Sequence, residues 1–153
     1  MIPARYISLL ENLTADQVGP RRYKVYHMPF YEKLLGILNA QDKKVYAHLD
    51  GKLQSLAGLV GQTGFDGIDS LTETPEGDMR IAGARAMWPD KCLWVNINVS
   101  LYSLTPDELS EIVRRMAREG APDGRKLVFE VSEDMPANWT ESIPVVLEAL
   151  EGL

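Results

Sequence analysis

Short apolar segments alternate with amphipathic ones along the whole chain. The apolar segments cover residues 6–10, 45–49, 64–71, 92–99 and 126–133, and each of them ends in polar residues. Runs of this length, rich in β-branched and aromatic residues, are typical of buried β-strands. Between them apolar residues recur at the helical period. We therefore predict helices near residues 20–39, 53–60, 81–88, 105–118 and 139–150.

Two of these helices have recognisable starts. Thr105 is followed by Pro106 and by Glu108 three residues later, and Asn138 is followed by Glu141 at the same spacing, as at helix N-termini. The first helix contains Pro29, which predicts a kink or a division near residue 28.

A strand followed by a helix, repeated five times, predicts the α/β fold class with a mostly parallel sheet and outer helices. In such sheets the functional residues collect at the carboxyl ends of the strands. The polar residues at the predicted strand ends are Glu11, Asn12, His48, Asp50, Asp69, Glu73, Asn96, Asn98, Glu130, Glu133 and Asp134.

Composition narrows the class of protein. The chain has 153 residues, of which 45% are hydrophobic, so we predict one globular domain over residues 1–153. A net charge of -6 argues against a nucleic-acid partner. No apolar run reaches the ~20 residues that span a membrane, and the N-terminus lacks the pattern of a signal peptide. A single cysteine, Cys92, fits a reducing compartment, so we expect a cytoplasmic protein.

The strand at 45–49 ends in a histidine and is followed by a carboxylate, in the sequence "AHLDG". His48 and Asp50 could form a general acid–base pair, in which the carboxylate orients the imidazole. They could equally be structural, with His48 in the core and Asp50 capping the next helix. Both interpretations stay open at this point.

Four segments, in order, resemble the uroporphyrinogen decarboxylase superfamily. They are "ENLTADQVGPRRYKVYHMPFYEKL", "KKVYAHLDGKLQSLAGLVGQTGFDGIDSL", "LTETPEGDMRIAGARAMWPDKCLWVNI" and "FEVSEDMPANWTESIPVVLEAL". The resemblance implies a TIM-type (β/α)8 barrel of which this chain supplies the C-terminal five or so βα units. It also implies partners, namely a second copy of the chain or a complementary N-terminal barrel portion.

The resemblance further implies an enzyme of the decarboxylase (lyase) or methyltransferase type. Its substrate would be a small organic molecule or one linked to a tetrapyrrole or corrinoid, and a corrinoid protein would be a possible partner. "VNINVSLYSLTP" departs from the porphyrin branch, which has "GNLDP" there. The alternative is a non-catalytic truncated barrel that binds a ligand or a partner.

A metal site is implied by the same resemblance. Corrinoid-linked methyltransferases of the superfamily bind zinc through His-x-Cys and a later Cys, and the matching positions here are His48, Asp50 and Glu133. One imidazole and two carboxylates suit Zn²⁺ or another divalent metal such as Mn²⁺ or Fe²⁺. His48, Asp50 and Glu133 are therefore the predicted catalytic and metal-binding residues, beside the acid–base and structural interpretations.

Five further residues are predicted to contact the substrate. Asn12, Glu73 and Asn96 are polar residues at strand ends, whereas Tyr102 and Trp139 follow loops on the same side. Trp94 lies within a strand and is predicted to belong to the core.

Overall fold

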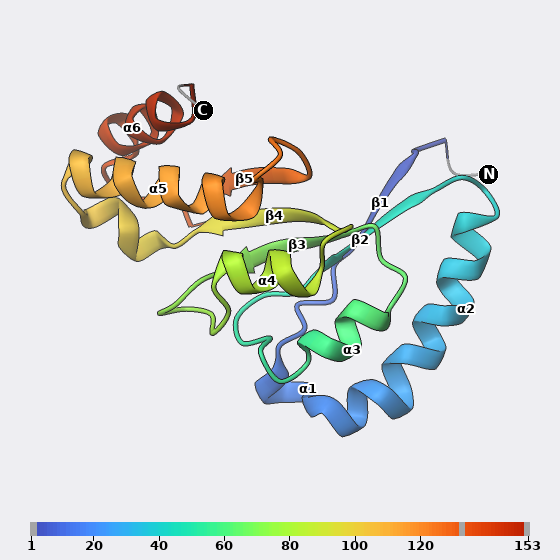
Figure 1. Ribbon diagram of the computed structural model, residues 1–153. Coiled ribbons are helices and arrows are strands. Elements are labelled where there is room, and N and C mark those ends of the chain that lie inside the picture. Colours follow the sequence, from blue (N-terminus) through green and yellow to red (C-terminus); the bar gives the residue numbers. More distant parts are fainter. Residues whose placement is uncertain (1–2, 132–133, 152–153) are drawn as a thin grey trace.

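The computed structural model describes residues 3–131 and 134–151, and it contains one five-stranded sheet (Figure 1). The strands are β1 (Tyr6–Leu9), β2 (Lys44–His48), β3 (Gly67–Thr72), β4 (Cys92–Ile97) and β5 (Leu127–Val131). Each strand pairs in parallel with the next one along the chain, in the order β1-β2-β3-β4-β5. The predicted α/β class with a parallel sheet is confirmed.

The helices follow the strands in alternation, as the sequence predicts, and gather on one side of the sheet (Figure 1). They are α1 (Ala15–Arg22), the π-helical turn η1 (Tyr23–His27), α2 (Met28–Asn39), α3 (Ala57–Gln62), α4 (Ile81–Met87), the 3-10 turn η2 (Val99–Ser103), α5 (Pro106–Gly120) and α6 (Trp139–Glu151).

The first helical region is divided, as Pro29 predicts. The wider π-helical turn η1 ends at His27, and Pro29 then lies in the first turn of α2. Proline has no N–H to donate to the preceding turn, and a wider turn accommodates that loss. The predicted start of α5 is also confirmed, because Thr105 and Glu108 form a reciprocal capping box.

The two faces of the sheet have different environments. Val45, Ala47 and Val95 face the helices and are fully buried in the main hydrophobic core. His48 and Asn96 alternate with these residues, lie on the opposite face and are only partly buried. In a closed barrel this second face lines the interior. Here it is accessible, because β1 and β5 form the two ends of the sheet within the described residues.

A glycine permits close packing on the interior face. A Cβ atom at Gly67 would lie 2.3 Å from Cε1 of Tyr46 and 2.7 Å from the carbonyl oxygen of Cys92. The Tyr46 ring therefore crosses over β3, and its centroid lies 5.5 Å from that of Trp94. These aromatic rings join β2 to β4 across the sheet.

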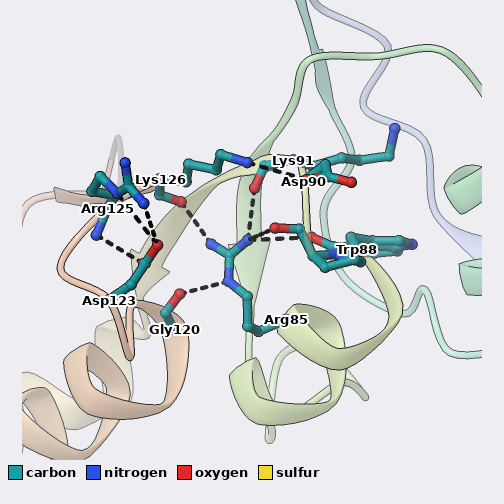
Figure 2. Close-up of polar contacts among 9 residues, drawn as sticks. Arg85, Trp88, Asp90, Lys91, Gly120, Asp123, Arg125 and Lys126 are labelled. Carbon is teal, nitrogen blue, oxygen red and sulfur yellow. Dashed lines mark hydrogen bonds and ion pairs between the residues drawn. The ribbon is translucent and has the colours of Figure 1, made fainter.

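At the amino ends of the strands, Arg85 of α4 connects several segments (Figure 2). Its Nε donates to the Gly120 carbonyl oxygen at 2.7 Å, and its two Nη groups donate to those of Lys91 at 2.8 Å and Lys126 at 2.7 Å. Lys91 and Lys126 directly precede β4 and β5. One guanidinium thus positions the starts of both strands against the C-terminus of α5.

Candidate functional site

A cavity of about 600 Å³ lies at the carboxyl ends of strands β2 to β5. Parallel strands bring their carboxyl ends together, so residues far apart in sequence meet here. The lining residues are His48, Asp50, Gly51, Asp69, Ser70, Thr72, Glu76, Trp94, Asn96, Asn98, Val99, Glu130, Val131 and Asp134. The functional residues were expected at this end of the sheet, and the cavity lies there.

Asp69 is the central acidic group of the cavity. It is 9% exposed, and its Oδ2 lies 3.5 Å from Nδ1 of His48, its neighbour in the β2–β3 register. Ser8 of β1 donates a hydrogen bond from Oγ to the same oxygen at 3.1 Å. The carboxylate can therefore hold the imidazole in a fixed orientation.

Glu130 lies beside Asp69 and keeps its proton to an unusually high pH. Burial, followed by the negative charge of Asp69, raises the pKa of Glu130 from 4.5 to about 7, although hydrogen bonds from Ser70 act in the opposite direction. Two neighbouring carboxyl groups resist ionising together. A carboxyl group that is still protonated near neutral pH can serve as an acid in catalysis.

An irregularity in β3 positions these groups. The register between β3 and β4 shifts between Ile68 and Leu71, and Ser70 adopts a left-handed φ of 65°. A bulge inserts a residue into one strand and changes the direction of the side chains around it. Here it allows both Asp69 and Ser70 to line the cavity.

Three lining residues carry buried polar atoms that have no hydrogen-bond partner among the described residues. They are Nε1 of Trp94, Oδ1 of Asn96 and Oδ1 of Asn98. Buried polar atoms are nearly always paired, so unpaired ones at a cavity wall can take a hydrogen bond from a bound water or ligand.

Of the predicted catalytic residues, His48 and Asp50 line this cavity. Asp50 does not cap the following segment, because Oδ1 of Asp78 accepts the backbone N–H groups of Leu53 and Gln54 at 2.6 and 2.9 Å. Glu133 lies outside the described residues.

Of the five predicted substrate contacts, only Asn96 lines the cavity. Glu73 is buried beneath the surface, where its carboxylate accepts from the backbone N–H of Ile81 at 2.8 Å and from Arg115 at 2.7 Å. These contacts give Glu73 a structural role at the start of α4. The sequence around Glu73 could not predict this role, because its partner Arg115 is 42 residues away in the chain.

The other three predicted contacts lie elsewhere. Tyr102 is 1% exposed and packs in a second core cluster with residues of α5 and α6. Trp139 begins α6 and is 52% exposed, and Asn12 is exposed in the loop after β1. A polar or aromatic residue after a strand can point in several directions, and only the loop conformation selects one.

The structure adds residues that the sequence did not single out. Asp69, Asn98 and Glu130 were three polar strand ends among many, and the same strand-end pattern contained them. Trp94 was assigned to the core, and this is corrected, because it lines the cavity. Trp94 lies two residues before Asn96, and residues two apart in a strand lie on the same face. This spacing could have placed Trp94 in the cavity together with Asn96.

The described residues contain no group of three His, Cys, Asp or Glu side chains that could hold a metal ion. His48 and Asp50 line the cavity and could supply two ligands, and Asp69 lies against the His48 ring. This donor set does not by itself make a site of the kind that binds a divalent metal through three or four protein ligands.

Comparison with known proteins places the fold. The family model described as uroporphyrinogen decarboxylase (URO-D) matches residues 4–150. The structure is similar to that of a methyltransferase from Methanosarcina mazei, with a TM-score of 0.67 and 15% sequence identity. The similarity covers 98% of this chain and 42% of that one, so the chain spans less than half of its structural neighbour. At this identity the likeness concerns the fold alone, which matches part of a TIM-type barrel.

Comparison with curated protein sequences found no match. Within residues 3–131 and 134–151, no helix is both long and apolar enough to cross a membrane.

Proposed function

Because this chain belongs to the uroporphyrinogen decarboxylase family, we propose that it is an enzyme, or the carboxyl-terminal part of one, that transfers protons to and from a small organic substrate in the strand-end cavity. The reaction would be of the decarboxylase or methyltransferase type. The observation that carries the proposal is the contact between His48 and Asp69, with the protonated Glu130 beside them.

Each of these groups has a chemical task in the proposal. Loss of CO₂ breaks a carbon–carbon bond, and the electron pair left on carbon must take up a proton, which Glu130 can donate. In methyl transfer from a methyl-corrinoid donor to a hydroxyl or thiol, the bond between methyl and donor breaks and its electron pair stays on the donor. The acceptor then loses a proton, which the His48 imidazole can take up. Asp69 would hold the His48 ring in place.

Turnover assays with a panel of small carboxylic acids and methyl acceptors test this proposal. We expect Glu130→Gln to lower the rate by about 10²–10⁴-fold, the usual loss when a general acid or base is removed. Asp90→Asn is a matched control, because the Asp90 side chain is 96% exposed at the other end of the strands. Equal rates in Glu130→Gln and wild type would overturn the proposed role.

The divalent metal implied by the family resemblance remains a separate proposal. His48 and Asp50 would supply two of its ligands, and Glu133, outside the described residues, the third. Metal analysis of the purified protein by mass spectrometry tests it. Stoichiometric Zn²⁺, Mn²⁺ or Fe²⁺ that disappears in His48→Ala would support the site, and a metal-free protein would refute it.

A complete barrel requires partner strands, and we propose that they come from a second copy of the chain or from a complementary amino-terminal portion of the barrel. The ends of the sheet expose apolar side chains, including Tyr6 at 63% and Val131 at 39%. Unpaired edges of this kind favour association. Light scattering tests the first source, since a compact monomer at high concentration would exclude self-association.

A further inference from the structure

We infer that the strand-end cavity binds a small organic ammonium group, in a ligand that also carries a hydrogen-bond acceptor such as a hydroxyl oxygen. The inference rests on the proposed function in using the same cavity, but it concerns binding and not the chemical step. It follows from the charge of the cavity and from the unpaired polar atoms in its wall.

The charge of the cavity favours a cation. Its ionisable lining residues are Asp50, Asp69, Glu76, Glu130, Asp134 and His48, with no lysine or arginine among the described residues that line it. Even with Glu130 protonated, four carboxyl groups remain. A cavity lined by negative charges attracts a cationic ligand and repels a ligand that carries only negative charge.

Asn98 indicates that the ligand donates hydrogen bonds. The residue is 1% exposed, and its Nδ2 donates to the backbone carbonyl of Glu73 at 2.8 Å and to the carboxylate of Glu76. Both partners are acceptors only, so the amide cannot be flipped. Its Oδ1 is therefore a buried acceptor without a protein partner in the described chain, and it requires an N–H or O–H donor.

Asn96 and Trp94 complete the pattern. Oδ1 of Asn96 is a second acceptor without a partner among the described residues. Nε1 of Trp94, which can only donate, has no oxygen or nitrogen partner there and faces only the weakly accepting sulfur of Cys92. A bare metal ion gives Trp94 Nε1 nothing to bond to. An alkylammonium group offers up to three N–H donors, and a hydroxyl on the same ligand offers the acceptor.

This inference narrows the substrate class. An acidic cavity repels a simple carboxylate, whereas a molecule that carries an ammonium group beside its carboxylate has no net charge. If the proposed reaction is a decarboxylation, the substrate would be an aminocarboxylate of this kind.

Binding of four defined probes to the 153-residue chain tests the inference, with NMR titration or calorimetry as the readout. The probes are 2-aminoethanol, ethylamine, the tetramethylammonium ion and propionate, all at neutral pH. We expect 2-aminoethanol to bind best and ethylamine more weakly. Tetramethylammonium, which has the charge but no N–H donors, should bind at least about tenfold more weakly than ethylamine.

Variants locate the binding. Asn96→Ala removes a lining amide whose Oδ1 has no partner among the described residues, so it should weaken 2-aminoethanol binding about tenfold. Asp50→Asn removes one charge from the lining, and the control Asp90→Asn removes one charge far from it. We expect the first to weaken binding and the second to leave it unchanged.

Three results would overturn the inference. They are propionate binding as well as the amines, tetramethylammonium binding as well as ethylamine, and competition by Mg²⁺ or Zn²⁺ at the same site with no amine binding. Failure of the proposed catalytic role is a separate outcome, since Glu130→Gln could leave turnover unchanged while the amine probes still bind.

Discussion

The stability of the sheet depends on Arg85, and replacing this residue gives the sharpest test of the packing. Its guanidinium donates to the backbone carbonyls of Gly120, Lys91 and Lys126 at 2.7, 2.8 and 2.7 Å, and contacts those of Trp88 and Pro89 at 3.2 and 3.3 Å (Figure 2). Arg85→Ala removes this donor from all of them, although the carbonyls of Lys126 and Trp88 keep the backbone N–H groups of Leu93 and Lys91.

The size of the effect follows from those contacts. The bonds to Gly120 and Lys91 are partly buried, and a charged hydrogen bond contributes about 1.5 kcal/mol or more. The bond to Lys126 is exposed and contributes about 0.5 kcal/mol. The longer contacts to the carbonyls of Trp88 and Pro89 use the Nη1 that already donates to Lys91, so they add little. Arg85→Ala should therefore lower the free energy of unfolding by about 3–4 kcal/mol. Arg85→Lys, which cannot form the planar fork, should lose about 2 kcal/mol.

Urea denaturation followed by circular dichroism measures this loss. With a slope of about 2 kcal/mol per molar urea, Arg85→Ala should shift the midpoint down by about 1.5–2 M. Arg125→Ala is the matched control, because this neighbouring arginine is 79% exposed and pairs only with Asp123 among the described residues. A loss below about 1 kcal/mol for Arg85→Ala, or one no larger than that of the control, would refute this reasoning.

Four other outcomes are expected. Gly67→Ala should destabilise the protein by about 2–3 kcal/mol, because its Cβ would meet a tyrosine ring at 2.3 Å. Gly58→Ala, in an open position of α3, should stabilise the protein by about 0.5–1 kcal/mol. Thermal melts measure both variants, and a higher melting temperature for Gly67→Ala or a lower one for Gly58→Ala than for wild type would contradict these predictions. Glu73→Ala should cost about 2–3 kcal/mol, because it leaves the backbone N–H of Ile81 without its acceptor and Arg115 with only Glu119 as a carboxylate partner, and an unchanged urea midpoint would contradict this. The raised pKa of Glu130, about 7 against 4.5, gives stability that is fully present below pH 4.5 and is lost as the pH rises through about 7. Glu130→Gln should flatten that slope in denaturation series from pH 4 to 8, and a slope as steep as that of wild type would contradict the assignment.

The order of the elements was predictable from the sequence because the signals are local. A strand such as 45–49 is recognised by its own apolar residues, and Thr105 and Glu108 mark a helix start within four residues. Pro29 divides the first helical region for a reason that lies in its own ring. None of these features depends on a distant part of the chain.

The site was only partly predictable, because its residues meet through the sheet register. His48 and Asn96 were identified from their places at strand ends, and both line the cavity. The partner of His48 is Asp69, 21 residues later, and the sequence pattern suggested Asp50 because it was near in the chain. Glu73 was misjudged for the same reason, since it lies in the loop after β3 and its partner Arg115 lies on α5.

By itself, the sequence determined the alternation of strands and helices, the parallel sheet that follows from it, and the end of the sheet at which polar residues collect. Those properties arise from short-range periodicity and from the geometry common to all parallel sheets. The tertiary structure alone decided which carboxyl groups share the cavity, which one keeps its proton and which polar atoms lack partners. These depend on distances between residues far apart in the chain, on burial, and on a bulge in β3 that no residue pattern announced.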